Sequence, residues 1–405
     1  MVLIGVCGKT NTGKTTFFSA ATMVDAEISN RVFTTIEPNK GVAYVTSPCV
    51  CRELGVKCQP QNSKCVDGTR LIPVRLTDVA GLVPGAHRGK GLGNQFLSDI
   101  MEASALINVI DASGGTDEEG RPVQPGTHEP MEDVMFLEKE IDYWILGILQ
   151  KNWKEICRKA GVGTGGGAAN SSAGAAKLDE LVFRQLSGLG IRHEDATHAL
   201  LKVPVNEKSP EDEMLRFVEI LRRKAKPMII AANKADVPQA EANIRKMKET
   251  ENIVVPCSAE CELALRRAER EGDIKYVPGG SSFEVIKQDL DGKKRMALDF
   301  IKKNVLERYG STGVQQVLNK TAFGLLNMIV VYPVENETHY TSGRGHVLPD
   351  AYLVPDGTTP KQLAAMIHTD FAERFVAAVN ARTKQRMAAD HGLKNNDIVK
   401  IMLRK

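Results

Sequence analysis

GVCGKTNTGKTT, residues 5–16, contains two glycines five positions apart, and the second is followed directly by Lys14 and Thr15. The preceding run, residues 2–7, is apolar and rich in β-branched side chains, which is typical of a buried parallel strand. The residues after Thr15 can continue as a helix. A GxxxxGK[ST] pattern between a strand and a helix predicts a phosphate-binding P-loop.

The chemistry of a P-loop assigns roles to these side chains. Glycines let the backbone bend so that several N–H groups point at a phosphate, and the helix N-terminus adds positive potential. Lys14 would reach the β- and γ-phosphates of a nucleotide, and the Thr15 hydroxyl would coordinate Mg²⁺. The predicted nucleotide-binding residues of this stretch are Asn11, Thr12, Gly13, Lys14, Thr15 and Thr16.

A second apolar run, residues 71–78, ends in Asp78, and Gly81 follows three positions later. A carboxylate at a strand end can hold Mg²⁺ as Walker-B aspartates do. The backbone N–H of Gly81 could contact a γ-phosphate. DxxG is a weak pattern by itself, but after a P-loop it predicts that Asp78 binds magnesium and that Gly81 belongs to the catalytic site.

Two further predicted strands lead into groups that could recognise a base. Residues 228–233 continue into the NKxD pattern, and residues 253–257 continue into Ser-Ala. A carboxylate at the last position of NKxD can accept two hydrogen bonds from guanine, whereas adenine offers no such donor pair on that edge. The predicted base-binding residues are Asn233, Lys234, Asp236, Ser258 and Ala259, of which Ala259 would contact the guanine oxygen through its N–H.

The order P-loop, DxxG, NKxD and SA, each at a predicted strand end, is the ordered set of guanine-nucleotide motifs. The combination is far more specific than any one member. It predicts an α/β fold in which a P-loop GTPase domain has a mostly parallel sheet. A P-loop kinase is the alternative enzyme class, but a kinase gives no reason for NKxD.

The chain resembles GTPases of the Obg family, and more narrowly the YchF-like branch in an archaeal form. FTTIEPNKG, residues 33–41, resembles the family's switch I, and DVAGLVPGAHRGKGLGNQFL, residues 78–97, resembles its glycine-rich switch II. The resemblance covers most of the chain and implies a molecular switch that hydrolyses GTP with Mg²⁺. YchF-like members with an altered fourth motif favour ATP, so the intact NKxD favours GTP here.

The resemblance also implies how catalysis would work. Thr35, with Thr34 as the near alternative, matches the switch I threonine that closes on Mg²⁺ and the γ-phosphate. Ras-like enzymes orient water with a glutamine after DxxG, but Leu82 stands here, so intrinsic hydrolysis should be slow. The predicted catalytic residues are Thr35, Gly81 and Lys14, and the predicted magnesium residues are Thr15, Thr35 and Asp78.

Three more side chains are candidates for contacts near the phosphates. Asn11 matches the asparagine of potassium-activated GTPases, in which K⁺ could replace the charge of an arginine finger. The alternative is an asparagine that only shapes the turn. His87 and His128 could approach the phosphate, and a lone surface histidine is the favoured alternative for each.

Composition limits the class of protein. The 405 residues carry a net charge of +3, with 42% hydrophobic and 25% charged residues, which is typical of a globular protein of two or three domains. No apolar run is long enough for a membrane span, and the N-terminus lacks the basic region of a secretory signal. We therefore expect a cytoplasmic protein with no membrane contact and no DNA partner.

The segment between the second and third motifs predicts an insertion into the GTPase domain. Residues 131–159 show helical spacing of apolar side chains, and a second helical pattern begins at Lys177. The predicted division is a first GTPase part over 1–111, with a cysteine-containing insertion at 47–68, and a helical insertion over 112–205. A flexible Gly-rich linker, natural or engineered, is expected over 161–177, followed by a second GTPase part over 206–280 and connecting helices over 281–326.

Four of the eight cysteines, Cys49, Cys51, Cys58 and Cys65, lie within seventeen residues. Four thiols can bind Zn²⁺ tetrahedrally. The spacings of one, six and six residues, however, are not those of paired Cys-x-x-Cys knuckles, and no histidine lies nearby. Reduced structural thiols are therefore the favoured alternative to a zinc site.

The last segment, residues 327–405, predicts strand, strand, helix and strand, and it resembles the TGS domain, a ubiquitin-like β-grasp fold. VPDGTTPKQLAAMIH and DIVKIML are the matching stretches, and the predicted helix runs over residues 359–379. Residues 361–405 hold nine Lys or Arg against four acids, which favours a ribosome or RNA contact. The candidate phosphate contacts are Lys384, Arg386, Lys394 and Lys400.

The sequence thus predicts a GTPase that acts at the ribosome, and it leaves other functions open. The alternatives are an RNA-binding regulatory protein with a structural nucleotide site, and an ATPase of the YchF type. The TGS-like segment could also only regulate the GTPase domain.

Overall fold

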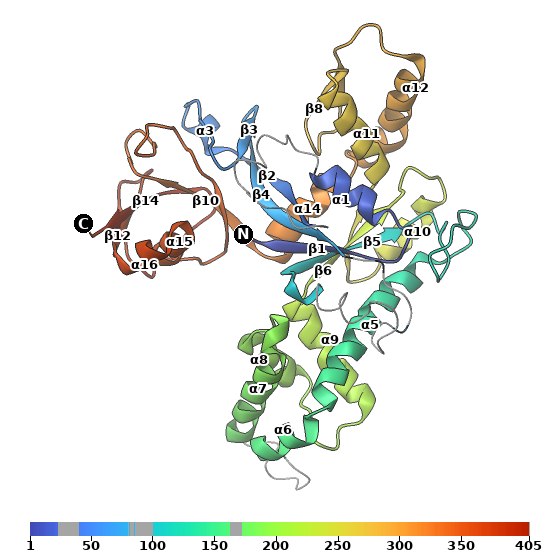
Figure 1. Ribbon diagram of the computed structural model, residues 1–405, viewed down its shortest axis with the longest axis vertical. Helices are drawn as coiled ribbons and strands as arrows, with labels where there is room; N and C mark the ends of the chain where they lie inside the picture. Colours follow the sequence, from blue (N-terminus) through green and yellow to red (C-terminus); the bar gives the residue numbers. More distant parts are fainter. Residues whose placement is uncertain (23–39, 80, 82–84, 86–99, 163–171, 405) are drawn as a thin grey trace. The chain divides into compact units, whose positions relative to one another are not determined.

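The computed structural model describes residues 1–22, 40–79, 81, 85, 100–162 and 172–404 (Figure 1). The chain divides into two compact units. We call residues 3–17 and 77–260 the P-loop unit, and residues 1–2, 18–76 and 261–405 the C-terminal unit. No helix in these described ranges is long and apolar enough to cross a membrane.

The P-loop unit is built on parallel strands. These are β1 (Leu3–Cys7), β5 (Ala105–Asp111), β6 (Met228–Asn233) and β7 (Ile253–Pro256), and they lie in that order in the sheet. Val6 pairs with Ile107, and Ile107 pairs with Ile229, all with fully buried side chains. Burial on both faces explains why these strands read as continuous apolar runs. Because parallel strands end at one sheet edge, their C-terminal residues are brought together.

Helices follow the strands as the P-loop and base motifs predict. α1 (Lys14–Thr22) begins at the P-loop lysine, α10 (Ala240–Met247) follows β6, and α11 (Ala259–Arg270) begins at the SA motif. The strand that ends in Asp78, β4 (Thr69–Asp78), also lies where the sequence predicts it. Its continuation pairs with β1, since Val79 N donates to Val6 O at 3.0 Å.

A helical insertion follows β5 and forms a bundle of its own (Figure 1). It consists of α5 (Pro130–Gln150), α6 (Trp153–Ala160), α7 (Ser172–Leu186), the 3₁₀ turn Ser187–Leu189, α8 (His193–Lys202) and α9 (Glu211–Ala225). Leu137, Ile141 and Ile145 of α5 are buried at helical spacing against α7 and α9. The predicted amphipathic pattern over 131–159 is thus two helices, because α5 ends at Gln150 and α6 begins at Trp153.

The predicted Gly-rich linker over 161–177 is partly wrong. Residues 163–171 lie outside the described ranges, but α7 already begins at Ser172. The first turns of α7 read SAGAAK, and alanine has the highest helix propensity of all residues. The helix therefore includes the alanine-rich end of a segment whose Gly, Ala and Ser content is typical of a linker.

The C-terminal unit begins with strands and ends in an α/β domain. Its first elements are β2 (Lys40–Pro48), α3 (Val50–Glu53) and β3 (Lys64–Val66), which pairs antiparallel with β4. A hairpin of β8 (Ile274–Tyr276) and β9 (Phe283–Val285) follows. The connecting helices are α12 (Gly292–Ile301), α13 (Glu307–Tyr309) and α14 (Val314–Asn319), with π-helical turns at Lys302–Leu306 and Lys320–Leu325.

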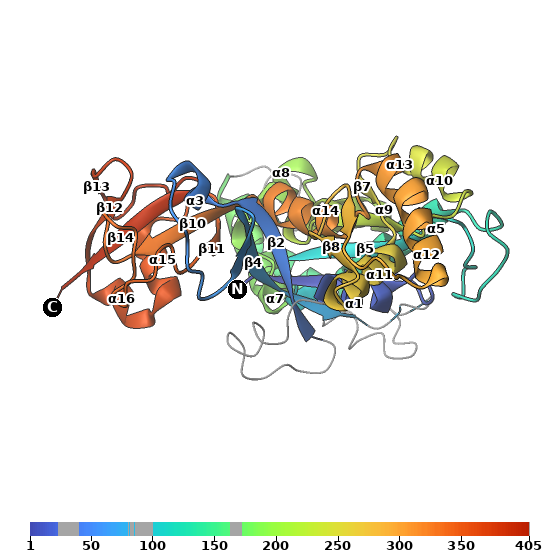
Figure 2. The same ribbon diagram turned by 90° about the horizontal axis from the view of Figure 1, so that it is seen from above.

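The last domain is a five-stranded sheet in the order β11-β10-β14-β12-β13 (Figure 2). Its elements are β10 (Met328–Val334), β11 (Tyr352–Pro355), α15 (Pro360–Ile367), α16 (Thr369–Glu373), β12 (Phe375–Asn380), β13 (Arg386–Met387) and β14 (Asp397–Leu403). The central strands β10 and β14 are parallel, as in a β-grasp fold. Leu363 of α15 packs with Val331 and Val399 in one core.

One predicted helix in this domain is wrong in its second half. The sequence predicts a helix over residues 359–379, but the helices end at Glu373, and Phe375–Asn380 form β12. Thr359 caps α15 by accepting from Gln362 N. The segment that follows combines alanine with Phe375 and Val376, so its local preference is divided. Antiparallel pairing of β12 with β14 decides in favour of a strand.

Candidate nucleotide-binding site

The P-loop follows β1 and bends through backbone conformations that favour glycine. Gly8 has φ +133° and Gly13 has φ +93°. A Cβ on Gly8 would lie 2.5 Å from the carbonyl oxygen of Val109, and one on Gly13 would collide with the Asn233 side chain. Neither position has room for a side chain. The two glycines thus serve close packing as well as the turn.

Lys14 and Thr15 begin α1 and lie beside the DxxG motif. Lys14 Nζ donates to the carbonyl oxygen of Lys9 at 2.7 Å, so its ammonium is held inside the loop. The Thr15 hydroxyl donates to Asp78 Oδ2 at 3.1 Å. A Cβ on Gly81 would lie 2.8 Å from Thr10 Oγ1 and 3.4 Å from Lys14 Nζ. The structure therefore brings Lys14, Thr15, Asp78 and Gly81 together.

Burial shifts the pKa values of both charged groups at this end of the site. Burial lowers the pKa of Lys14, and the Asp78 carboxylate opposes this shift. Burial also raises the pKa of Asp78, against the hydrogen bond from Thr15 and the charge of Lys14. Each shift disfavours the charged form of its group. Ligands of opposite charge would remove these penalties, so the site favours an anion at Lys14 and a cation at Asp78.

Asn233 connects three segments at the other end of the site. Its Nδ2 donates to the carbonyl oxygen of Thr12 at 2.9 Å, and its Oδ1 accepts from Ala259 N at 3.0 Å. The side chain thus joins the P-loop, the end of β6 and the start of α11. The bond to Ala259 uses the same N–H that the sequence assigns to the guanine oxygen. A base oxygen would have to share or replace Asn233 there.

Lys234 and Asp236 follow Asn233, and their side chains contact residues that lie at or just after the ends of two different strands. Lys234 has φ +59°, and its Nζ lies 2.7 Å from Asp111 Oδ2 at the end of β5. Asp236 Oδ1 accepts from the Ser258 hydroxyl at 2.5 Å. The second carboxylate oxygen of Asp236 adds a further acceptor for a pair of donors on a base. Each NKxD side chain is therefore oriented by a partner from another strand end.

Asp111 lies at this site although the sequence motifs do not include it. It is 1% exposed and accepts from Lys234, from Ser113 Oγ at 2.6 Å and from Thr116 Oγ1 at 2.5 Å. Burial raises its pKa, but these hydrogen bonds outweigh burial and hold the pKa below its usual range. A signal was present in the sequence, because Asp111 ends the apolar run ALINVID at the same sheet edge.

A buried group behind the P-loop was also missed. Lys9 is 3% exposed, and its Nζ lies 2.6 Å from Asp133 Oδ1 and 3.3 Å from the Thr116 carbonyl oxygen. His128 Nε2 lies 2.8 Å from the same Asp133 oxygen, with 8% of the side chain exposed. The favoured alternative of a lone surface histidine is thus wrong for His128, which is partly buried and lies within hydrogen-bond distance of Asp133.

Asn11 adopts a left-handed backbone conformation in the P-loop, and its side chain bonds to a neighbouring loop. Its φ is +62°, and its Nδ2 donates to the carbonyl oxygen of Gly120 at 2.7 Å. Only the side-chain oxygen therefore remains for a cation. Four other predicted residues, Thr34, Thr35, Leu82 and His87, lie outside the described ranges.

The four clustered cysteines of the C-terminal unit also come together. Their sulfur atoms all lie within 4.8 Å of one another. Burial raises the pKa of Cys51 to about 11, and the neighbouring Cys49 and Cys58 add to the shift. Cys65 is raised in pKa as well, first by burial and then by Cys49. The structure brings together all four residues that the sequence offered as zinc ligands.

Two of the four basic residues that are predicted to contact phosphate in the last domain already contact Glu337, and the other two have exposed side chains. Lys400 Nζ lies 2.6 Å from Glu337 Oε2, and Lys384 Nζ donates to the Glu337 carbonyl oxygen. Arg386 and Lys394 have exposed side chains. Because an internal partner competes with a phosphate, Arg386 and Lys394 are the better placed of the four.

Family models match three parts of the chain. Residues 3–140 match the model described as a 50S ribosome-binding GTPase. Residues 231–336 match the G4 motif-containing domain of Obg-like, YGR210-like GTPases. Residues 344–403 match the TGS domain, as the sequence predicts.

Whole-chain comparisons agree with these models. The GTP-binding protein MJ1332 of Methanocaldococcus jannaschii is 49% identical over 406 residues, which cover 99% of both chains. The crystal structure of a GTP-binding protein from Pyrococcus horikoshii matches with a TM-score of 0.75 and 40% identity over 100% of both chains. The ribosome-binding ATPase YchF of Escherichia coli O157:H7 is 27% identical, over 92% of this chain and 86% of the relative.

The first two of these relatives match this chain over nearly its whole length, and the third matches most of it. The chain therefore belongs to the Obg-like family of GTP-binding proteins, and its residues 231–336 are of the YGR210-like type.

Proposed function

We propose that this protein hydrolyses GTP slowly to GDP and phosphate with Mg²⁺, and that it acts as a molecular switch at the ribosome. The observation that carries the proposal is the base end of the site, where Asp236 is oriented by Ser258 and Asn233 joins the P-loop to α11. A nucleotide triphosphate and its base would thus be held by one connected set of residues.

The choice of guanine rests on Asp236. Guanine presents an N1–H and an exocyclic amine to a carboxylate, and a site built to pair such donors discriminates strongly against a base that lacks them. Ser258 donates to Oδ1 and fixes the plane of the carboxylate. Lys234, held by Asp111, would lie over the base.

Thr15 and Asp78 fit a magnesium ion. Mg²⁺ prefers hard oxygen ligands and is commonly bound by one or two protein oxygens together with substrate phosphates. The structure gives a hydroxyl and a carboxylate whose oxygens lie 3.1 Å apart. When bound, Mg²⁺ neutralises negative charge on the phosphates. Thr35 would add a third oxygen by resemblance.

The protein's own groups would act on the γ-phosphate by position and charge. The Lys14 ammonium would leave the Lys9 carbonyl oxygen and contact the β- and γ-phosphates. Gly81 lies against Lys14 and Thr10, so its N–H is a candidate donor to the same phosphate. No side chain at position 82 can orient water, since it is leucine. We therefore expect a slow intrinsic rate and dependence on a partner or on K⁺ near Asn11.

Relatives suggest where the switch acts. The bacterial relatives of the YchF type are named ribosome-binding ATPases. The exposed side chains of Arg386 and Lys394 and the basic composition of residues 361–405 fit an RNA phosphate surface. A cytoplasmic location and a switch between GTP and GDP states are parts of the same proposal.

Asp236→Asn tests the base assignment. We expect binding of guanosine nucleotides to fall by a factor of roughly 100 and binding of xanthosine nucleotides to rise, because xanthine replaces the amine by an oxygen that pairs with an amide. Asp289→Asn, at an exposed position of the C-terminal unit, is the matched control. Indifference of Asp236→Asn to the base would favour a kinase, and tighter binding of ADP than of GDP would favour an ATPase.

Co-sedimentation with ribosomal subunits tests the partner. We expect pelleting with a non-hydrolysable GTP analogue but not with GDP, and the preference should persist as salt is raised. Equal pelleting in both states, with no GTP turnover in the presence of ribosomes and K⁺, would favour an RNA-binding protein with a structural nucleotide site. Absence of pelleting in both states contradicts the ribosome assignment.

A further inference from the structure

The cysteine cluster has the geometry of a tetrahedral metal site. Cys51 Sγ and Cys65 Sγ are 3.9 Å apart, and all four sulfur atoms lie within 4.8 Å of one another. A disulfide requires an S–S distance of about 2 Å. Four thiolates at 2.3 Å from a zinc ion lie roughly 3.8 Å from one another. The observed separations therefore match ligands around one ion.

The four thiols come from four different places in the backbone. Cys49 follows β2, Cys51 lies in α3, Cys58 lies in the loop after α3, and Cys65 lies in β3. Cys49 N donates to the Gly68 carbonyl oxygen at 2.8 Å, and Val56 N donates to the Cys51 carbonyl oxygen at 3.0 Å. Because the sulfur atoms converge from separate elements, a shared ligand would tie these elements together.

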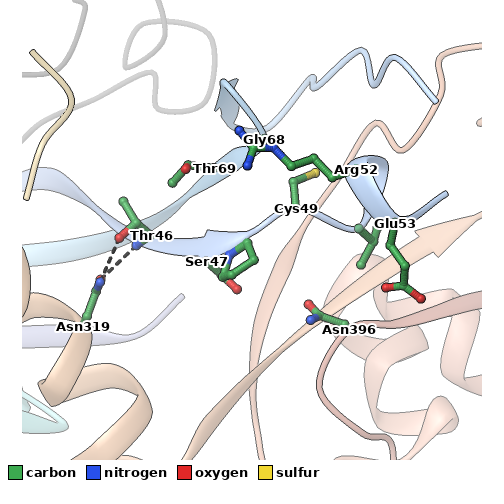
Figure 3. A pocket seen from close by; sticks show the side chains of 11 residues that line it. Thr46, Ser47, Cys49, Arg52, Glu53, Gly68, Thr69, Asn319 and Asn396 are labelled. Atoms are coloured by element: carbon green, nitrogen blue, oxygen red, sulfur yellow. Dashed lines mark hydrogen bonds between the residues drawn. The ribbon is translucent and has the colours of Figure 1, made fainter. Parts of the chain in front are cut away.

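The segment that carries the cluster has almost no apolar core. Residues 49–51 are buried, but from residue 52 to residue 68, all within the described ranges, Ser63 is the one buried residue, and Val66 is partly buried. Beside Cys49 lies an open pocket of about 530 Å³, whose lining includes Arg52, Glu53 and Thr69 (Figure 3). Ordering a residue costs about 1–2 kcal/mol of backbone entropy. Apolar burial does not offset that cost here, which is the usual situation in which a small module relies on a metal.

A buried cation close to the cluster has too few partners. Arg70 is 0% exposed, and its Nε and Nη1 atoms have no hydrogen-bond partner among the described residues. Arg70 is the register partner of Cys65 in the pairing of β3 with β4. Burial raises the pKa of Asp350, and the Arg70 charge opposes this shift, so Asp350 is one counter-charge for the buried guanidinium. Zn²⁺ with four thiolates carries a net charge of −2, which would add a second counter-charge beside this buried cation.

We propose that Cys49, Cys51, Cys58 and Cys65 bind one Zn²⁺ as a structural tetrathiolate site. Four protein ligands close the coordination shell, so the ion would stabilise structure and leave no position for a substrate. Binding replaces the S–H protons, which pass to solvent, and no oxidation is involved.

The zinc site would position a loop of the last domain. Cys58 is followed by residues 59–62, which bond to residues 347–351. Gln59 N donates to the Val347 carbonyl oxygen at 2.8 Å, and Gln61 N donates to the Pro349 carbonyl oxygen at 2.7 Å. Arg70 Nη2 donates to the same stretch, at 2.9 Å to Leu348 O. Zinc thus fixes the 49–68 segment in the form that holds the loop before β11.

Metal analysis of the full chain tests the proposal. We expect about one zinc per chain after purification without chelators, and tetrahedral thiolate absorption bands when Co²⁺ replaces Zn²⁺. Cys65→Ser should lose the metal. Cys157→Ser, at a fully buried cysteine of the P-loop unit, should keep it.

A second measurement covers the case in which Cys65→Ser does not fold. A mercurial reagent added to the wild-type protein should release zinc in step with the loss of four thiols, as followed with a zinc-sensitive dye. Fewer than about one zinc in ten chains, after folding with zinc present, would overturn the proposal. Iron in place of zinc, or equal zinc in the wild type and Cys65→Ser, would overturn it too.

Discussion

In the P-loop unit, the loops of the nucleotide site are held by hydrogen bonds between protein groups. In the C-terminal unit, the 49–68 segment holds four thiols whose closest partners are one another. Asn233, Lys234 and Asp236 each have a partner from another strand end. Burial, and after it the neighbouring thiols, raise the pKa of Cys51 and Cys65. The first site is therefore preorganised by the protein, and the second would depend on the proposed ion for its stability.

The difference follows from what each ligand must do. A nucleotide has to enter and leave, so the polar groups of its site need partners within the protein while the nucleotide is absent. A structural metal stays bound, so its ligands can depend on it. The following predictions test this contrast, in order of decreasing effect.

Removal of zinc should have the largest effect. Amides of residues 52–66 should exchange hydrogen at least about 100-fold faster, because zinc contributes on the order of 10 kcal/mol to the folding of small zinc modules. Amides of residues 8–16 should exchange at their original rate. Hydrogen exchange with mass spectrometry measures both segments in one sample, and equal exchange with and without zinc would contradict a structural metal.

Asn233→Ala should weaken the preorganised site itself. It leaves the buried Ala259 N–H without its acceptor, and this costs about 1–3 kcal/mol. GDP affinity should fall roughly 10- to 100-fold. Asn304→Ala is the control, because the Asn304 side chain donates to Phe300 O one turn earlier, far from the strand ends of the P-loop unit in sequence. Calorimetric titration with GDP checks the result, and unchanged affinity would show that Asn233 does not hold the site.

The pH dependence of magnesium binding should be smaller but specific. Mg²⁺ needs the Asp78 carboxylate, and burial raises the pKa of that group. As the pH falls, protonation of Asp78 therefore begins to weaken Mg²⁺ binding at a higher pH than it would for an ordinary aspartate. A higher Mg²⁺ concentration should lower the pH at which half of the Mg²⁺ binding is lost.

The same shift has a consequence for stability. An acid with a raised pKa in the folded state binds its proton more tightly there, so its contribution to stability increases as the pH falls. Asp78→Asn should therefore stabilise the protein modestly at neutral pH, in thermal unfolding without nucleotide. A lower melting temperature for Asp78→Asn would show that Asp78 is stabilising in its charged form.

Potassium should have the smallest effect. If the Asn11 oxygen holds K⁺, GTP turnover should be several-fold faster in K⁺ than in Na⁺, and Asn11→Ala should remove the difference. The bond from Asn11 to the Gly120 carbonyl oxygen predicts a small loss of stability as well. Equal turnover in both salts would leave Asn11 with the turn-shaping role that its φ of +62° already indicates.

The sequence by itself determined the strands of the P-loop unit and the motifs at their ends. The runs 105–111 and 228–233 are apolar except for Asn108 and the terminal Asp111 and Asn233, because both faces of a parallel sheet are buried, so their pattern is strong and local. The positions of Lys14, Asp78 and Asp236 at or after the ends of strands could be predicted for the same reason, and their roles in nucleotide binding stay a prediction.

Tertiary contacts decided the conformation and the neighbours of residues for which the local sequence allowed more than one outcome. Phe375–Asn380 became a strand because β14 offers a partner, and Asp111 became part of the site because Lys234 reaches it from the next strand. The convergence of Cys49, Cys51, Cys58 and Cys65 is of this kind as well. Their spacing fits no standard metal motif, because a β-hairpin and a short helix, rather than paired turns, bring the sulfur atoms within reach of one ion.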